Sequence, residues 1–176
     1  MAHIAVLGLG NWGTAIARLW LLEGHNVKGW TIEQEVYESI TMNGVNEKYL
    51  PDHPVEAMEA TMHIEEALDG VEIVVLAVPS SVILDVVDQI IPHLRPGHVL
   101  LDLAKGLAPG SQLISQAIHE KLNAAEKNNP LAVVTGPTIA PEAAGGVMTT
   151  ALVASEDVSV AQHLASTLTT QTFILH

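Results

Sequence analysis

The chain has 176 residues and a formal net charge of −13 at pH 7, and only 7 of its residues are lysine or arginine. This balance argues against nucleic acid and anionic membranes as partners, because both require clustered positive charge. The chain has no cysteine, which excludes disulfides and thiol catalysis. Its nine histidines are scattered without the spacing of metal ligands, so we predict no metal site.

Apolar runs alternate with longer amphipathic stretches, as is typical of successive β-α-β units. The core is aliphatic, since 48% of the residues are hydrophobic and only 3% are aromatic. We predict an α/β fold with a doubly wound, mostly parallel, Rossmann-like sheet, and antiparallel edge strands are possible late in the chain. Strands are expected at 4–7, 27–30, 57–61, 73–78, 99–103, 131–135, 149–154 and 172–175. Helices are expected at 14–22, 33–42, 64–68, 82–94 with an interruption near Pro92, 111–125, 136–144 and 158–168.

The length suits one domain, which we place at residues 1–176. No apolar run reaches the roughly 18 residues of a membrane-spanning helix, so no membrane insertion is expected. The N-terminus enters a strand directly and leaves no room for a signal peptide. A cytoplasmic location is therefore the expectation.

The first predicted strand and helix flank a glycine-rich turn, Gly8-Leu9-Gly10-Asn11-Trp12-Gly13. In dinucleotide-binding proteins the first glycine of such a turn permits the tight bend. The second lets a pyrophosphate approach the backbone, and the third lets the helix pack on the strand. The helix start adds free N–H groups and a positive dipole end. We predict that Gly8, Gly10 and Gly13 form a dinucleotide site, the alternative being a turn that only packs.

Ligands of open α/β sheets bind beyond the carboxyl ends of the strands. Turns that follow predicted strands lie at 8–13, 79–82, 104–107 and 136–140, so we expect them to share one edge of the sheet. Lys105 is the only cation in these turns. It is a candidate for binding an anionic group or polarising a carbonyl, with a solvated lysine as the alternative.

Other residues near these turns have both a functional and a structural interpretation. Trp12 either covers a cofactor or packs on the first strand. Gly136 and Thr138 either present a backbone N–H and a hydroxyl to an anion or cap the next helix. Glu142 either pairs with Lys105 or stabilises the first turn of that helix.

The second strand of such a fold is expected to end near an acidic residue that binds the adenosine ribose. Glu33 has the expected position, about 20 residues after the glycines, although it also suits the start of a helix. No arginine or lysine lies between Trp30 and Glu47. A 2′-phosphate lacks an obvious partner, which favours NAD over NADP, with NADP still open.

Further motifs follow in order along the chain. They are Trp30 closing the second strand, Asn46-Glu47-Lys48-Tyr49-Leu50-Pro51, Ala77-Val78-Pro79-Ser80, Ala104-Lys105-Gly106-Leu107 and Gly136-Pro137-Thr138-Ile139-Ala140-Pro141-Glu142. Together with the glycine-rich turn they resemble the N-terminal NAD-binding domain of NAD(P)-dependent glycerol-3-phosphate dehydrogenase over nearly the whole chain. The glycine-rich turn is common to many dehydrogenases, whereas the later motifs are more specific to this family.

The resemblance implies an oxidoreductase of glycerophospholipid and carbohydrate metabolism. Its reaction is reversible hydride transfer between NAD(P)H and the phosphorylated pair dihydroxyacetone phosphate and sn-glycerol 3-phosphate. It also implies that Lys105 lies near both cofactor and substrate. The candidate cofactor-binding residues are Gly8, Gly10, Asn11, Trp12, Gly13, Ile32, Glu33, Pro79, Lys105 and Ala140, and the candidate substrate-binding residues are Lys105, Gly136 and Thr138.

The resembled family continues with a helical domain that supplies the principal catalytic lysine, and that domain is absent here. Lys121 and Lys127 are predicted on a helix and a turn away from the strand ends, so neither replaces that lysine. Pro141 and the Gly145-Gly146 pair also depart somewhat from the family pattern. We expect a cofactor-binding domain with little or no turnover alone and a homo-oligomer in the full-length form. The alternatives are a ketopantoate-reductase-like or phosphogluconate-dehydrogenase-like enzyme and a non-catalytic dinucleotide-sensing module.

Overall fold

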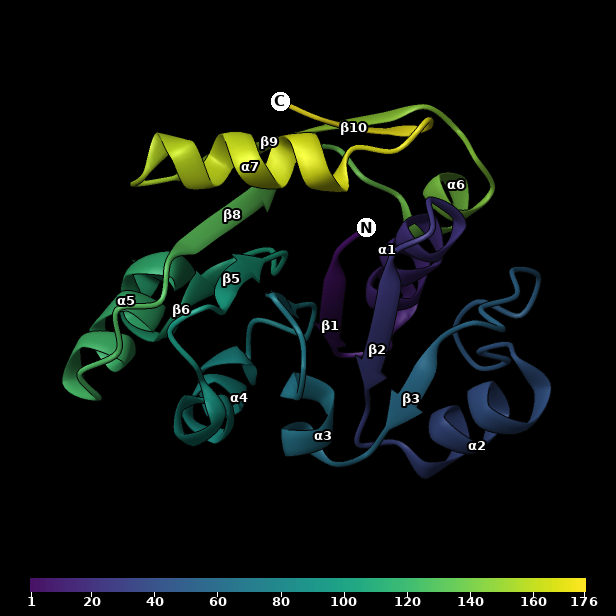
Figure 1. The fold of residues 1–176 in the computed structure, drawn as a ribbon, viewed down its shortest axis with the longest axis horizontal. Coiled ribbons are helices and arrows are strands. Elements are labelled where there is room, and N and C mark those ends of the chain that lie inside the picture. The colour runs from purple at the N-terminus through teal and green to yellow at the C-terminus, as the bar shows by residue number, and fades with distance from the viewer.

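A computed structural model describes residues 1–176 as an eight-stranded sheet with helices on both faces (Figure 1). The strands of this sheet are β1 (His3–Leu7), β2 (Asn26–Trp30), β3 (Glu59–Thr61), β4 (Ile73–Leu76), β5 (Val99–Asp102), β8 (Leu131–Thr135), β9 (Thr149–Ser155) and β10 (Phe173–Leu175). The helices are α1 (Asn11–Leu22), α2 (Gln34–Asn43), α3 (Ile64–Leu68), α4 (Ile83–Ile90), α5 (Ile114–Ala124), α6 (Ala140–Ala144) and α7 (Val158–Leu168).

The strand order is β10-β9-β8-β5-β4-β1-β2-β3, and all neighbours are parallel except β8 and β9. The predicted doubly wound, mostly parallel sheet is confirmed. The antiparallel edge is confirmed as well: β9 pairs antiparallel with β8, and β10, which is parallel to β9, shares its direction. The strand order reverses between β1 and β4, and Leu7 is in register with both Trp30 and Leu76. Three strands therefore end side by side at the switch point, where ligands of this architecture bind.

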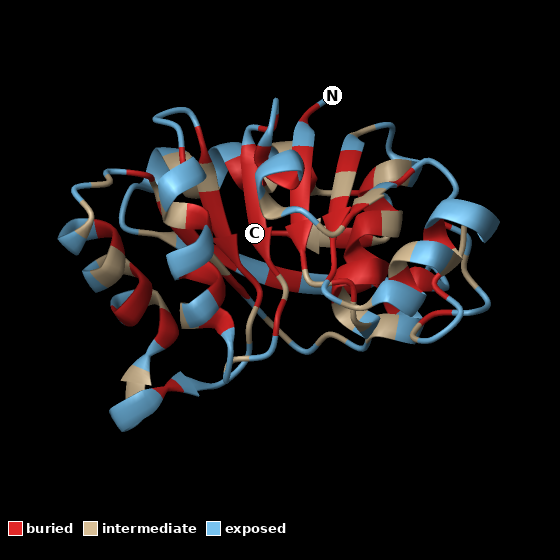
Figure 2. Ribbon diagram, turned by 90° about the horizontal axis from the view of Figure 1, so that it is seen from below, coloured by how far each residue is buried: buried red, intermediate tan, exposed pale blue.

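Two layers of aliphatic side chains hold the helices on the sheet. One layer joins α1, α2, α6 and α7 to the sheet, and the other joins α3, α4 and α5. Helix α4 shows why: Ile83, Val86, Val87 and Ile90 recur at helical spacing and are all buried. Burial of each such side chain is worth roughly 1.5–3 kcal/mol. Figure 2 shows the result, buried strands between helices whose outer faces are exposed.

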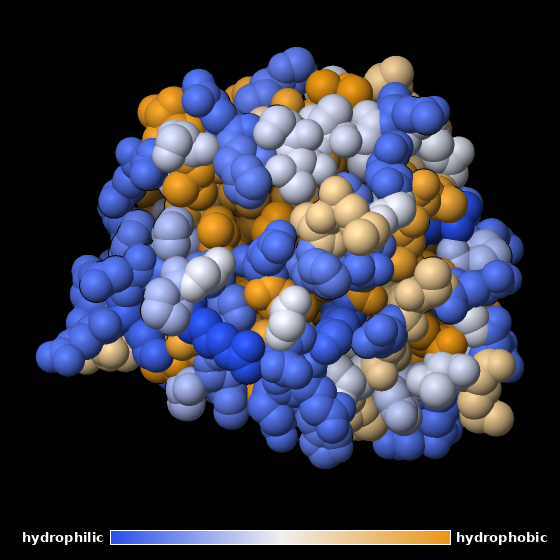
Figure 3. Space-filling model, viewed as in Figure 1, coloured by the Kyte–Doolittle hydropathy of each residue, from blue (hydrophilic) through white to orange (hydrophobic).

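The surface carries apolar residues between hydrophilic ones (Figure 3). One cause is the alternation of buried and exposed residues along β9. Ala151 and Val153 belong to the same apolar layer as α7, whereas Leu152 between them is 58% exposed. No helix of the structure is long and apolar enough to cross a membrane.

Several predicted boundaries were wrong by a few residues. The helix expected from residue 111 begins at Ile114, because residues 107–113 form a small antiparallel ribbon of β6 (Leu107–Ala108) and β7 (Gln112–Leu113). The helix expected from residue 136 begins at Ala140, since Ile139 is still extended. The interruption predicted near Pro92 in the helix over 82–94 is confirmed, because α4 ends at Ile90 and the chain continues as the short 3₁₀ turn η1 (Ile91–His93) around Pro92.

Candidate functional site

A groove of about 1090 Å³ lies at the carboxyl ends of the central strands. A second cavity of about 310 Å³ shares Trp12, Lys105 and Thr138 with it. The two hollows bring together residues from all the turns that follow β1, β2, β4, β5 and β8. The groove is lined by the predicted residues Gly8, Gly10, Asn11, Trp12, Ile32, Glu33, Pro79, Lys105, Thr138 and Ala140, and the second cavity adds Gly136. Gly13 lines neither.

The three glycines of the first turn have different roles. Gly8 has φ +106°, and a Cβ there would lie 2.8 Å from the carbonyl oxygen of Ala77. A Cβ on Gly13 would lie 1.8 Å from the carbonyl oxygen of Gly8. A Cβ on Gly10, by contrast, would meet nothing within 4 Å. The fold itself requires the first and third glycines, whereas the second faces open space beside the start of α1, which suits the close approach of a pyrophosphate.

Trp12 has one side open to the cavities and another packed against the protein. It lines both the groove and the second cavity. Its ring also meets Phe173 of β10 edge to face, with ring centroids 5.9 Å apart. Because this contact holds the indole from the far end of the chain, the tryptophan forms a fixed wall of the groove.

Lys105 follows β5, and its Nζ donates to the carbonyl oxygen of Thr138 at 3.2 Å. This bond joins the turn after β5 to the loop after β8. Lys105 is the only lysine or arginine that lines either cavity. The suggested pair between Lys105 and Glu142 is wrong, because no such ion pair forms. Glu142 lies in the first turn of α6, as its alternative interpretation expected.

Asp102 is a site residue that the sequence analysis missed. It ends β5, is only 2% exposed and lines the second cavity together with Lys105. Its Oδ1 accepts a hydrogen bond from the backbone N–H of Ala104 at 2.8 Å. Burial raises the pKa of Asp102 to about 6, against the smaller opposing influence of that bond. The available signal was one acidic residue inside an otherwise apolar strand.

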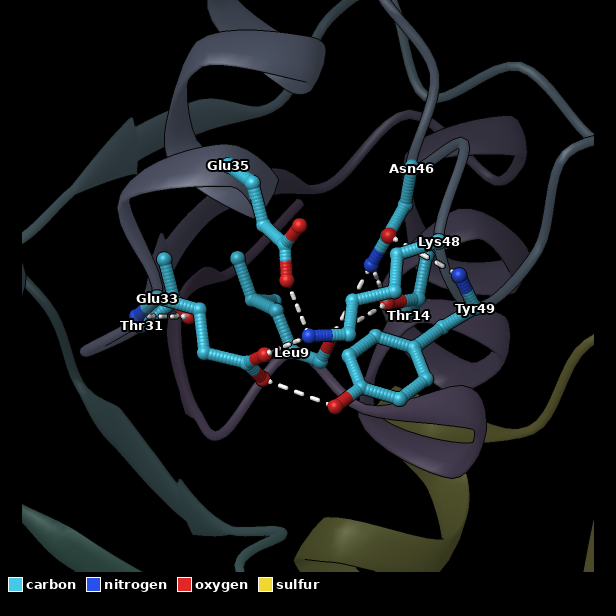
Figure 4. Close-up of polar contacts among 8 residues, drawn as sticks. All are labelled: Leu9, Thr14, Thr31, Glu33, Glu35, Asn46, Lys48 and Tyr49. Atoms are coloured by element: carbon cyan, nitrogen blue, oxygen red, sulfur yellow. Dashed lines mark hydrogen bonds and ion pairs between the residues drawn. The ribbon is translucent and has the colours of Figure 1, made fainter.

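Glu33 follows β2 and belongs to a polar cluster shown in Figure 4. Its carboxylate accepts hydrogen bonds from Lys48 Nζ at 2.5 Å and from the Tyr49 hydroxyl at 2.9 Å. The hydrogen bond from Lys48 is the main reason why the pKa of Glu33 lies below its usual value. Glu33 occupies the N-cap position of α2, but its side chain does not cap the helix. The carboxylate instead forms part of the groove wall.

Lys48 changes the argument on cofactor choice. The stretch without lysine or arginine ends at Glu47, and the next residue folds back to the end of β2. Besides Glu33, Lys48 Nζ contacts Glu35 of α2 (Figure 4). A cation is therefore present at the end of the groove where sequence reasoning found none.

Asn46 fixes the loop that carries Lys48 and Tyr49. It is fully buried, and its Nδ2 donates at 2.8 Å to both the carbonyl oxygen of Leu9 and the hydroxyl of Thr14. Its Oδ1 accepts from the N–H of Tyr49 at 3.2 Å. One side chain thus ties this loop to the glycine-rich turn and to α1.

We expect Asn46→Leu to destabilise the chain by about 1–3 kcal/mol, because the polar groups of Leu9, Thr14 and Tyr49 that bond the Asn46 amide lose their partner. Urea unfolding followed by circular dichroism measures the change. Asn43→Leu is the matched control, since the Asn43 amide is exposed and bonds only Glu47. Equal losses in the two variants would contradict the assigned role of Asn46.

The sheet order, the glycine-rich turn and the groove at the strand ends define a Rossmann-type dinucleotide-binding domain. Residues 3–161 match the family described as NAD-dependent glycerol-3-phosphate dehydrogenase N-terminus. The chain belongs to this family, and the predicted NAD(P)-dependent dehydrogenase family is confirmed. The match favours this family over the ketopantoate-reductase-like and phosphogluconate-dehydrogenase-like alternatives.

Relatives and solved structures agree with this assignment. Glycerol-3-phosphate dehydrogenase (NAD(P)+) of Exiguobacterium sp. is 38% identical over 175 residues, which are 98% of this chain and 51% of that protein. The Acidobacterium capsulatum enzyme of the same name is 37% identical, over 100% of this chain and 54% of its own length. A crystal structure of glycerol-3-phosphate dehydrogenase from Coxiella burnetii superposes with a TM-score of 0.90 at 31% identity, covering 99% of this chain and 53% of that one. The chain thus spans about half the length of these relatives.

Proposed function

We propose that residues 1–176 are the dinucleotide-binding domain of an enzyme that transfers a hydride between NAD(P)H and dihydroxyacetone phosphate or sn-glycerol 3-phosphate. The observation that carries the proposal is one groove that extends from Glu33, past Gly10, to Lys105. A dinucleotide site needs, in this order, a partner for the adenosine ribose, room for the pyrophosphate and a place for the reactive nicotinamide. The names of the relatives support the choice of substrate.

The residues of the groove fit the parts of such a cofactor. Gly10 leaves room for the pyrophosphate, and the start of α1 at Asn11 directs N–H groups toward it. The carboxylate of Glu33 accepts hydrogen bonds from the adenosine ribose. Ile32 and Pro79 line the adenosine portion, and Ala140 lies at the nicotinamide end. The bound nicotinamide supplies or accepts the hydride.

Lys105 takes the anionic substrate. The chain has a net charge of −13, so a phosphorylated substrate needs a local cation, and this is the lysine that both cavities share. Its ammonium binds the phosphate or polarises the carbonyl oxygen that becomes an alkoxide. Gly136 and Thr138 hold the substrate beside it. The remaining catalytic groups come from the part of the enzyme that this chain does not span, so turnover by the chain alone is little or none.

We further propose a homo-oligomer for the full-length form. Support comes from apolar side chains at the surface, such as Leu152 of β9, which is 58% exposed. Exposed apolar surface of this kind is commonly covered by another domain or subunit.

The test is a calorimetric titration of the chain with NADH, followed by titration of the NADH complex with dihydroxyacetone phosphate. We expect Lys105→Ala to weaken binding of the phosphate compound about tenfold or more, because a charge-assisted hydrogen bond contributes about 1.5–3 kcal/mol. Lys121→Ala is the control. It removes the same charge, but Lys121 pairs with Asp88 and lines neither cavity.

Two results would count against the proposal. If the wild-type chain binds neither NADH nor NADPH, the groove is not a dinucleotide site. If Lys105→Ala and Lys121→Ala behave alike toward dihydroxyacetone phosphate, Lys105 does not hold the substrate.

A further inference from the structure

Lys48 and Tyr49 together hold the two carboxylate oxygens of Glu33 at the acidic end of the groove. Lys48 Nζ lies 2.5 Å from one carboxylate oxygen of Glu33, and the Tyr49 hydroxyl bonds the other oxygen at 2.9 Å. The ammonium also lies 5.4 Å from the centre of the Tyr49 ring. A carboxylate has about four acceptor positions, so two donors fix its orientation and leave positions for ribose hydroxyls.

The charges of this cluster bear on the choice between NAD and NADP. Glu33 and Glu35 bring two negative charges to one ammonium, so the cluster has a net charge of −1. A 2′-phosphate placed there meets two carboxylates and a lysine that already uses two of its three donors on them. A ribose diol, in contrast, meets an oriented acceptor.

We propose that Lys48 is a specificity-determining residue of the dinucleotide site. It holds Glu33 in position for the ribose hydroxyls of NAD, and it becomes the phosphate-binding cation for NADP when Glu33 and Glu35 are made neutral. This inference rests on the proposed function, because it takes the end of the groove at Glu33 as the ribose position.

Removing Lys48 and freeing Lys48 from its two acidic partners have opposite effects on cofactor binding. Without the ammonium, Glu33 and Glu35 repel each other, and the ribose acceptor loses its fixed orientation. With both acids changed to glutamine, the side chains keep their size but lose their charge. The freed ammonium, 40% exposed in the wild type, then binds an incoming phosphate.

The experiment titrates NADH and NADPH into the wild-type chain and three variants. These are Lys48→Met, the double variant Glu33→Gln/Glu35→Gln, and a triple variant that combines all three substitutions. We expect the wild type to prefer NADH by about tenfold and Lys48→Met to weaken NADH binding about fivefold to tenfold without improving NADPH. The double glutamine variant tightens NADPH about tenfold or more, with a steep dependence on salt, and the triple variant loses this gain.

Lys28→Met is the control, because Lys28 is a half-buried lysine of β2 that lines neither cavity and whose Nζ bonds only the backbone carbonyls of Glu66 and Asp69. Circular dichroism confirms that each variant is folded. A gain in NADPH affinity that persists in the triple variant would overturn the proposal. NADH binding by Lys48→Met equal to that of the wild type and Lys28→Met would overturn it as well. If the wild type binds neither nucleotide, the proposed function itself has failed, whereas normal NADH binding with no variant effect rejects only the role of Lys48.

Discussion

Replacing Gly13 with alanine is expected to destabilise the chain by at least about 3 kcal/mol, the upper end of typical overpacking effects. The new Cβ would lie 1.8 Å from the carbonyl oxygen of Gly8. That oxygen belongs to backbone and has little freedom to move, since Gly8 has φ +106° and its N–H bonds the carbonyl oxygen of Trp30 at 3.0 Å. Urea unfolding followed by circular dichroism measures the loss, which is a large share of the stability of an ordinary domain.

Gly10→Ala is the matched comparison, because the Cβ at this position meets no atom within 4 Å. We expect a change in unfolding free energy below about 1 kcal/mol, within the range of N-cap substitutions. The same change weakens NADH binding, since the methyl group occupies the space given to the pyrophosphate. Similar losses of stability in the two variants would show that the glycines do not divide into packing and ligand positions.

The second large effect concerns Asp102 and pH. Burial raises the pKa of Asp102 from its usual 3.8 to about 6, so the fold favours the protonated form. The contribution of protonated Asp102 to the free energy of unfolding is fully present below pH 3.8 and is lost as the pH rises through 6. A difference of about 2 units corresponds to about 3 kcal/mol. We therefore expect Asp102→Asn to gain stability relative to the wild type by up to about 3 kcal/mol between pH 3.5 and pH 8.

Thermal or urea unfolding across this pH range measures the difference between Asp102→Asn and the wild type. Asparagine keeps an oxygen acceptor for the N–H of Ala104 and replaces the other carboxylate oxygen by an uncharged NH2 group. Asp88→Asn is the control, because Asp88 is an exposed partner of Lys121 and surface pairs contribute little. Parallel stability curves for wild type and Asp102→Asn would contradict a buried, titrating carboxyl at the end of β5.

Local sequence patterns were sufficient to predict the sheet and the shared edge of its loops. Apolar runs mark the central strands, and parallel strands bring their carboxyl ends to one edge of the sheet. The sequence alone therefore predicts that Gly10, Lys105 and Thr138 lie near one another. Helix boundaries were less accurate because capping was weak. Ile139 and Leu113, for example, precede α6 and α5 without a side-chain cap.

The missed residues depend on contacts that no local pattern encodes. Lys48 meets Glu33 only because the buried Asn46 fixes the loop after α2 against the glycine-rich turn. The expected pair of Lys105 and Glu142 is the converse case. Opposite charges in neighbouring loops suggested a contact, whereas the lysine bonds the backbone of Thr138. Both cases depend on how a loop folds in three dimensions rather than on spacing along the chain.

The central place of β1 has a consequence for synthesis of the protein on the ribosome. β1 is made before the other strands of this sheet, but it needs β2 on one side and β4 on the other. β4 begins only at Ile73, so at about 5–20 residues per second one edge of β1 stays unpaired for several seconds. Ile4 to Leu7, fully buried in the finished fold, remain available to other nascent chains during that time. The delay before β4 emerges is therefore a stage at which this chain is exposed to aggregation.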